Sequence, residues 1–234
     1  MRLGPDVSPD LRQSFLFLIT HSQRDEKPNK VKRKEGDGRM NIVQKMEALA
    51  DEWHCGVERK GKGHVPYIAH PRAVVTQLKA WGMTEEANPV PLAVAWGHDL
   101  VEDTRVPAIS ILNAAGEHGI KVFEGILYLT FSRPEYPSAK DHDDADRLYM
   151  ERLAREAPPE ILMVKLADRV CNTRDFTKEP FKNEPTKPAR YLHEADPILA
   201  AVSRVPSEFV VAVKATIEEL KLQVGYADWT PQEI

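Results

Sequence analysis

The stretch Trp96-Gly97-His98-Asp99-Leu100-Val101-Glu102-Asp103-Thr104 crowds one imidazole and three carboxylates together, with no Lys or Arg among them. Because the run before it, residues 90–96, is apolar, we expect one helix over about 90–102 that leads the cluster into the interior. On such a helix His98 and Glu102 share a face, as do Asp99 and Asp103. Carboxylates packed in this way repel one another by roughly a few tenths of a kcal/mol per pair. A bound cation would relieve the repulsion, so the stretch predicts half of a metal site with carboxylates left over for proton transfer.

The composition is that of a globular protein without a strong charge bias. The chain has 234 residues, of which 42% are hydrophobic and 29% charged, and a net charge of −4, so we expect no stable nucleic-acid binding. Its two cysteines, Cys55 and Cys171, exclude a disulfide framework and suit a reducing compartment. The longest early apolar run, residues 15–19, is too short for a signal sequence or a membrane span. We therefore expect a cytoplasmic protein with no membrane partner.

The two ends of the chain differ from the middle. Residues 23–39 are nearly free of apolar side chains and contain a basic cluster over 30–34. Such a composition favours disorder, and a solvated tail explains it better than a nucleic-acid-binding arm. We predict a disordered extension over 1–39, one helical domain over 40–225 and a C-terminal tail over 226–234.

Helical periodicity predominates in the domain, and strand-like alternation is nearly absent. Apolar residues at 42, 46, 49 and 53 predict a first helix, and Pro71 suits the first turn of a second that Gly82 ends. Further helices are expected around 109–112, over 121–130, from 148 to the prolines at 158 and 159, and over 161–175, 189–203 and 207–224, with a polar loop over 132–146. The predicted fold class is all-α, a single bundle with the site between helices.

Two further segments offer ligands for the predicted metal. His70 lies at the start of the second helix, while Asp168 and Asn172 lie four apart in a mostly apolar helical segment. Each alone has an ordinary explanation, as a helix-terminal histidine or as a buried partner of a neighbouring arginine. Together with His98 and Asp99, His70 and Asp168 would supply two imidazoles and two carboxylates. An octahedral ion held by these four ligands has positions left for water. Mn²⁺ or Fe²⁺ suits this set better than a thiolate-seeking metal, while Zn²⁺, Co²⁺ and Mg²⁺ stay open.

Three motifs, taken together, resemble a known family. They are Tyr67-Ile68-Ala69-His70-Pro71, then His98-Asp99-Leu100-Val101-Glu102-Asp103-Thr104, then Val164-Lys165-Leu166-Ala167-Asp168-Arg169-Val170-Cys171-Asn172-Thr173-Arg174. In this order and approximate spacing they are similar to the HD-superfamily hydrolase domain of RelA/SpoT-type proteins, and more closely to stand-alone small alarmone hydrolases. The similarity covers about residues 41–200. It implies an HD-domain bundle that removes pyrophosphate from the 3′ position of ppGpp or pppGpp and leaves GDP or GTP.

The resemblance also implies roles for individual residues. The metal ligands that it implies, usually for Mn²⁺, are His70, His98, Asp99 and Asp168. The pair that it implies for positioning and deprotonating the attacking water is Glu102 and Asp103. Asn172 matches a residue that contacts the ribose-phosphate region, and Arg59 and Lys60 lie in the loop where the family places basic residues against the base and phosphates. The implied partner is a small nucleotide, and the oligomeric state stays open.

The chemistry of these residue types supports the implied reaction independently. A divalent metal lowers the pKa of its water from 15.7 towards about 7, and a carboxylate that accepts the proton contributes roughly 10²–10⁴-fold. A highly anionic substrate also requires cations such as Lys165, which lies in an apolar helix. Trp96-Gly97 and the segment 128–133 depart from the family pattern. Alternative functions are therefore removal of the 2′-phosphate of NADPH, hydrolysis of adenine alarmones, and a catalytically silent nucleotide-binding regulator.

Overall fold

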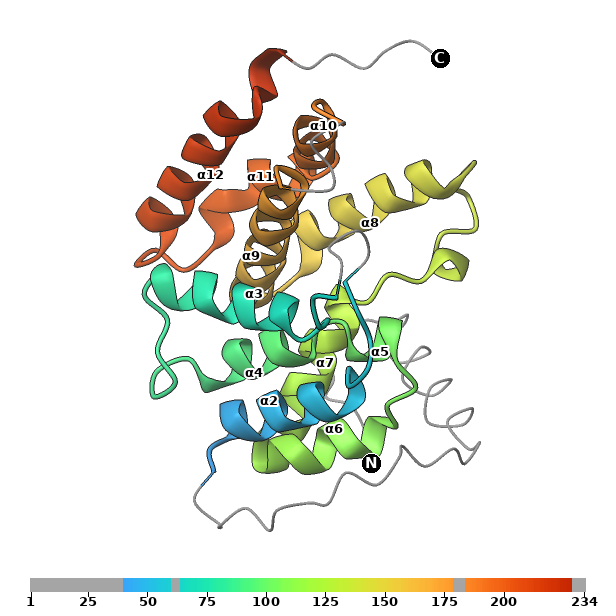
Figure 1. The fold of residues 1–234 in the computed structure, drawn as a ribbon, viewed down its shortest axis with the longest axis vertical. Coiled ribbons are helices and arrows are strands. Elements are labelled where there is room, and N and C mark those ends of the chain that lie inside the picture. Colours follow the sequence, from blue (N-terminus) through green and yellow to red (C-terminus); the bar gives the residue numbers. More distant parts are fainter. Residues whose placement is uncertain (1–39, 60–63, 179–183, 229–234) are drawn as a thin grey trace. The chain divides into compact units, whose positions relative to one another are not determined.

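The structure, a computed structural model, describes residues 40–59, 64–178 and 184–228 (Figure 1). These residues form helices joined by short turns, and no β-strand is among their elements, so the predicted all-α fold class is confirmed. The chain divides into two compact units. Unit 1 contains the residues up to Val57, Pro66–Arg72 and Thr84–Thr130. Unit 2 contains Glu58–Val65, Ala73–Met83 and the residues from Phe131 onward.

Unit 1 is a stack of helices in which α2 packs against α4 and α6, and α7 packs against α4 and α6 (Figure 1). Its elements are α2 (Ile42–Trp53), α4 (Pro89–Gly97), α5 (Leu100–Asp103), α6 (Ala108–Ala115), η1 (Gly116–His118) and α7 (Gly119–Leu129). A capping box starts α2, because the Asn41 side chain accepts a hydrogen bond from the backbone N–H of Gln44 and the Gln44 side chain accepts one from that of Asn41. The first predicted helix is thus confirmed.

Unit 2 is built around the long helix α9, which contacts α10, α11 and α12. Its elements are η2 (Arg133–Glu135), α8 (His142–Glu156), α9 (Pro159–Phe176), α10 (Lys187–His193), α11 (Asp196–Ala200), η4 (Ala201–Arg204), α12 (Val210–Val224) and η5 (Tyr226–Asp228). The helix α3 (Ala69–Ala80) contributes its first four residues to unit 1 and the remainder to unit 2. It begins two residues before Pro71, which lies in its first turn as expected.

The prediction of a single helix over 90–102 is wrong, because the structure divides this segment at the site. Helix α4 ends at Gly97 and α5 begins at Leu100, so His98 and Asp99 lie at the junction between them. A Cβ atom at position 97 would lie 2.7 Å from Ile126 Cδ1 and 2.8 Å from Met46 Cε. The ends of these two side chains therefore pack closely over Gly97 and would have to shift for a larger residue, and glycine itself weakens a helix by about 1 kcal/mol relative to alanine.

Two other boundaries differ from the sequence expectation. The polar loop predicted over 132–146 ends early, because Asp141 caps α8 by accepting a hydrogen bond from Asp144 N at 2.9 Å and the acidic run begins that helix. The helix predicted over 189–203 is divided into α10, α11 and η4. Pro197 lies at the start of α11 and has no N–H to continue the preceding helix.

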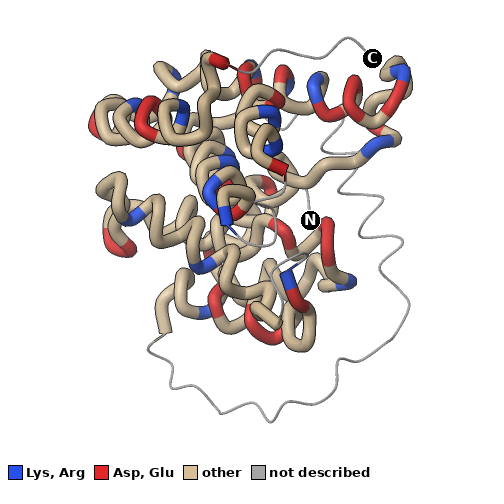
Figure 2. The backbone as a smooth tube through the Cα atoms, turned by 45° about the horizontal axis from the view of Figure 1, so that its top comes forward, with Lys and Arg blue, Asp and Glu red and all other residues tan. Residues whose placement is uncertain are grey.

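The predicted extension over 1–39 lies outside the described residues, as does the predicted tail from residue 229 onward, and the domain limits stay predictions. Figure 2 shows acidic and basic residues interspersed along the helices, in agreement with the net charge of −4. Within the described segments, none of the helices combines the length and the apolar character needed to cross a bilayer. The cytoplasmic location also stays a prediction.

Candidate functional site

Three of the four predicted metal ligands lie together in unit 1, and we call His70, His98 and Asp99 the His-His-Asp cluster. The two imidazoles face each other, with His70 Nε2 3.2 Å from His98 Nε2. Oδ1 of Asp99 lies 3.2 Å from His98 Nε2, and its Oδ2 lies 3.6 Å from His70 Nε2. One ligand atom from each residue lies within 4.8 Å of the others, so a single metal ion could be held by all three.

The proton distribution on His98 fits a metal ligand. Its Nδ1 lies 2.8 Å from the backbone carbonyl oxygen of Ala95. A carbonyl oxygen can only accept, so Nδ1 donates the proton in this contact, and the tautomer with its proton on Nδ1 has the Nε2 lone pair facing the rest of the cluster. Both His70 and His98 are 3% exposed, which limits competition from solvent. Nitrogen and oxygen donors of this kind fit a divalent metal ion.

A second polar group lies in unit 2, and we call Arg59, Lys165, Asp168, Asn172 and Asp175 the cation network. Lys165 Nζ lies 3.0 Å from Oδ2 of Asp168, and Asn172 Nδ2 donates to Oδ1 of Asp168 at 2.6 Å. Arg59 donates from one terminal nitrogen to Asn172 Oδ1 at 2.7 Å and to Asp175 Oδ2 at 2.9 Å. The four members on α9 recur at intervals of three and four residues, so they share one face of that helix.

The ammonium group of Lys165 stays charged although its side chain is largely buried. Burial disfavours the charged form, but the neighbouring Tyr149 and Asp168 groups outweigh that effect and raise the pKa of Lys165. The ammonium also lies 5.4 Å from the centroid of the Tyr149 ring. Burial raises the pKa of the Cys171 thiol, next to Asn172, to about 12. That thiol is therefore protonated near neutral pH and unsuited to act as a nucleophile.

Known proteins with similar sequences are much longer than the matched region. No protein-family model matches the chain. It is 31% identical over 146 residues to a probable guanosine-3′,5′-bis(diphosphate) 3′-pyrophosphohydrolase of Synechocystis, which covers 62% of this chain and 18% of that protein. It is 30% identical over 132 residues to a GTP pyrophosphokinase of Streptomyces coelicolor, which covers 56% of this chain and 14% of that protein. It thus spans less than a quarter of the curated relatives it matches.

A third relative and a solved structure extend the match over most of the chain. The relative is the bifunctional (p)ppGpp synthase/hydrolase RelA of Mycobacterium tuberculosis, 28% identical over 185 residues, which covers 79% of this chain and 23% of that protein. The structure is described as a metazoan ortholog of SpoT that hydrolyses ppGpp. It aligns with a TM-score of 0.60 and 20% identity over 80% of this chain and 97% of that chain. The resemblance to RelA/SpoT-type HD domains is confirmed.

The other residues implied by the family resemblance lie in different parts of the chain. Glu102 and Asp103 are exposed on α5, immediately after the His-His-Asp cluster, and Asp103 N donates to the carbonyl oxygen of Asp99 at 2.8 Å. Lys60 lies outside the described residues. Asp168 belongs to unit 2 and the three clustered ligands to unit 1, so the four-ligand set stays a prediction.

The sequence patterns did not point to two residues beside the His-His-Asp cluster, Tyr67 and His54. The Tyr67 hydroxyl donates to Asp99 Oδ2 at 2.7 Å. Burial first, and then the nearby carboxylates of Asp99 and Asp103, raise the pKa of Tyr67, which keeps this hydroxyl protonated. The His54 ring stacks on Tyr67 with 4.6 Å between ring centroids, and burial lowers the pKa of His54. The signal that could have pointed to Tyr67 is its position three residues before His70, in the first of the three family motifs.

Proposed function

We propose that this protein is a metal-dependent hydrolase that removes pyrophosphate from the 3′ position of ppGpp or pppGpp and yields GDP or GTP. The observation that carries the proposal is the His-His-Asp cluster, with its facing Nε2 atoms 3.2 Å apart and two exposed carboxylates directly after it in the sequence. The relatives named for this activity and the three sequence motifs support the substrate class.

The proposed cofactor is Mn²⁺, held by His70, His98 and Asp99. We also propose Asp168 as the fourth ligand, and the support for it is the match of the third motif to the family. Imidazole nitrogens and carboxylate oxygens suit Mn²⁺ or Fe²⁺, and no thiolate belongs to the proposed set. When bound, such an ion would lower the pKa of water and screen the negative charge of the phosphates.

The exposed carboxylates Glu102 and Asp103 are proposed to position the attacking water and to accept its proton. The oxygen of that water forms a new bond to the phosphorus nearest the ribose, and the bond from this phosphorus to the 3′ oxygen breaks. The 3′ oxygen takes up a proton and becomes a hydroxyl group, and pyrophosphate leaves. A general base of this kind contributes roughly 10²–10⁴-fold to the rate.

The cations of unit 2 are proposed to bind the phosphates and ribose of the substrate. Arg59 and Asn172 already contact each other at 2.7 Å, and Lys165 supplies a charged ammonium nearby on α9. A guanidinium group recognises phosphate oxygens through paired N–H donors, which gives orientation as well as charge. Lys60 is proposed to assist them on the strength of the sequence alone.

Identification of every product would test the proposal. The Mn²⁺-loaded protein would be incubated separately with ppGpp, NADPH and an adenine alarmone, and products would be separated by ion-exchange chromatography. We expect GDP and pyrophosphate from ppGpp, and no comparable turnover of the others. Orthophosphate released from NADPH, or no product from any substrate, would contradict the proposal. Protein stripped with a chelator and then reloaded with Mn²⁺ provides the control for metal dependence.

A further inference from the structure

We propose that Tyr67 is a positioning residue for the proposed metal ligand Asp99, and that the His54 ring holds the phenol of Tyr67 in place. The inference rests on the proposed function only in taking the His-His-Asp cluster as the metal site. It concerns the binding of the ion and is independent of the nucleotide.

A single turn of the chain supplies both Tyr67 and the first ligand. The backbone N–H of His70 donates to the carbonyl oxygen of Tyr67 at 2.9 Å, which fixes the two residues relative to each other at the start of α3. From this turn, the His70 ring and the Tyr67 hydroxyl both reach the same carboxylate, at 3.6 Å and 2.7 Å from Oδ2 of Asp99. The turn therefore provides one ligand and orients another.

The hydrogen bond from Tyr67 restricts how Asp99 can rotate. A carboxylate has two equivalent oxygens, and a donor on one of them restrains the rotation that positions the other. With Oδ2 held by the phenol, Oδ1 lies 3.2 Å from His98 Nε2. The second oxygen is thereby directed at the centre of the cluster before any ion arrives, which is the condition for tight binding in a preformed site.

His54 supports this arrangement by packing. Its ring lies nearly parallel to that of Tyr67, at an angle of 24° and a centroid distance of 4.6 Å, and it is 2% exposed. Within the described residues neither ring nitrogen of His54 has a hydrogen-bond partner. The contribution of His54 is therefore the face of its ring, and a phenyl ring should replace it.

The test is the affinity of Tyr67→Phe for Mn²⁺, measured by equilibrium dialysis and compared with that of the unmodified protein. Loss of a hydrogen bond to a ligating carboxylate typically weakens metal binding roughly 10–100-fold, and we expect a change in this range. We also expect the visible absorption of bound Co²⁺ to change, because it reports ligand geometry. Unchanged affinity and an unchanged Co²⁺ spectrum would overturn the inference.

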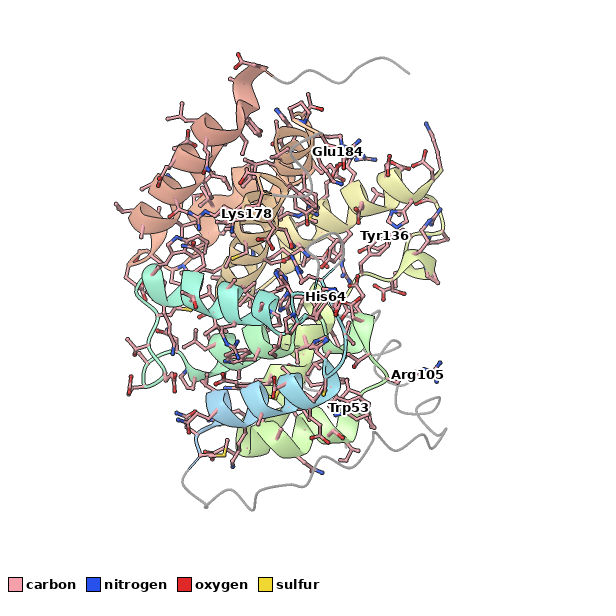
Figure 3. The ribbon with its side chains drawn as sticks, viewed as in Figure 1. Trp53, His64, Arg105, Tyr136, Lys178 and Glu184 are labelled. Atoms are coloured by element: carbon pink, nitrogen blue, oxygen red, sulfur yellow. The ribbon has the colours of Figure 1, made fainter. Side chains whose placement is uncertain are left out.

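Tyr136→Phe is the matched control. The Tyr136 hydroxyl is also buried, and among the described residues it has no hydrogen-bond partner; Figure 3 labels this residue, which belongs to unit 2. The same atom is removed from the same residue type, but this hydroxyl donates to none of the proposed ligands, so we expect metal affinity close to that of the unmodified protein. A loss equal to that of Tyr67→Phe would show a general effect on the fold and overturn the inference.

A second pair of variants tests the stack without removing the hydroxyl. His54→Phe keeps an aromatic face and should bind Mn²⁺ like the unmodified protein, whereas His54→Ala should bind it more weakly. Equal affinity of the two variants would overturn the role of His54. If the unmodified protein binds metal but releases no pyrophosphate from ppGpp, the proposed function fails while these affinity comparisons still decide the role of Tyr67.

Discussion

The aspartates of the two polar groups, the partly exposed Asp99 and the buried Asp168, have opposite surroundings. In unit 1, Asp99 lies beside two imidazoles and accepts a hydrogen bond from a phenol hydroxyl. In unit 2, Asp168 contacts the Lys165 ammonium and the Asn172 amide. A charge that is largely removed from water is costly unless it is paired. The surroundings of Asp99 therefore favour the arrival of a cation, whereas Asp168 is neutralised by the protein itself.

This difference separates two tasks that the sequence alone had merged. The His-His-Asp cluster has the donors of a metal site. The cation network has a guanidinium and an ammonium, which suit phosphate oxygens. Asp168 is assigned to the first task by its motif and takes part in the second by its contacts. Substitution of Asp168 is therefore the strongest test of this separation between metal binding and phosphate binding.

The largest effect is expected from Asp168→Ala. If Asp168 is the fourth ligand, the variant should lose retained Mn²⁺ and all measurable release of pyrophosphate, because one of four protein ligands is gone. Asp175→Ala is the control for metal binding, since Asp175 pairs with Arg59 in the same network. Near-full metal content of Asp168→Ala, measured by elemental analysis, would remove Asp168 from the ligand set and leave it to the cation network.

A smaller effect is expected from Glu102→Gln. The variant should retain Mn²⁺ and lose roughly 10²–10⁴-fold in kcat, because it loses the carboxylate proposed to accept the proton of water. Glu117→Gln is the matched control, as Glu117 is also in unit 1 and its side chain is 90% exposed. Unchanged kcat in Glu102→Gln, with metal content verified, would assign the proton acceptor elsewhere.

Substitution in the cation network should affect the substrate and spare the metal. Arg59→Ala removes a charge-assisted donor worth about 1.5–3 kcal/mol, so we expect kcat/KM for ppGpp to fall about 10–100-fold, mainly through KM, with metal content unchanged. Lys178→Ala is the control: Lys178, labelled in Figure 3, lies 3.7 Å from Asp175 but is 66% exposed. Equal losses in both variants would indicate a diffuse electrostatic effect.

The smallest effect concerns the pH dependence of stability in the metal-free protein. The pKa of His54 is lowered from 6.5 mainly by burial. The ionisable groups around it are Asp99, Asp103, His98 and His70. Because the unfolded chain then binds a proton more readily than the folded one, His54 contributes stability that is fully present above pH 6.5 and is lost as the pH falls towards its folded-state pKa.

His54→Phe removes this titration and keeps the aromatic face. Its free energy of unfolding, measured by urea denaturation with a chelator present, should therefore decline less between pH 7 and pH 5 than that of the unmodified protein. Parallel declines in the two proteins would show that the burial of His54 does not contribute to acid sensitivity.

Much of the helical framework is predictable from the sequence because it follows from local rules. Apolar periodicity predicts α2 and α9, and the clustering of His70 with His98 and Asp99 follows the motifs. The break at His98 is not predictable in this way, since it accompanies packing of Gly97 against Met46 and Ile126, which are distant in sequence. The start of α8 was predictable in principle, because Asp141 precedes an acidic first turn that suits the helix dipole.

The supporting residues of the site depend on side-chain geometry, which periodicity does not contain. Tyr67 belongs to the first family motif. Its hydrogen bond to Asp99, however, forms only because the fold brings the start of α3 to the junction after α4. His54 follows Trp53 at the end of α2 and had no pattern to distinguish it. In contrast, the pairing of Lys165 with Asp168 lies at a spacing of three residues and could have been predicted from α9 alone.

The central claim, that the His-His-Asp cluster holds a metal ion, is tested most directly by metal content. The unmodified protein and His98→Ala would be dialysed against Mn²⁺ and freed of loosely bound ions. Their metal content would then be measured by inductively coupled plasma mass spectrometry. His118→Ala, a histidine of the same unit beside Glu117, serves as the control. We predict a single retained ion per chain in the unmodified protein and in His118→Ala, and almost none in His98→Ala. Equal metal content in all three would contradict the claim.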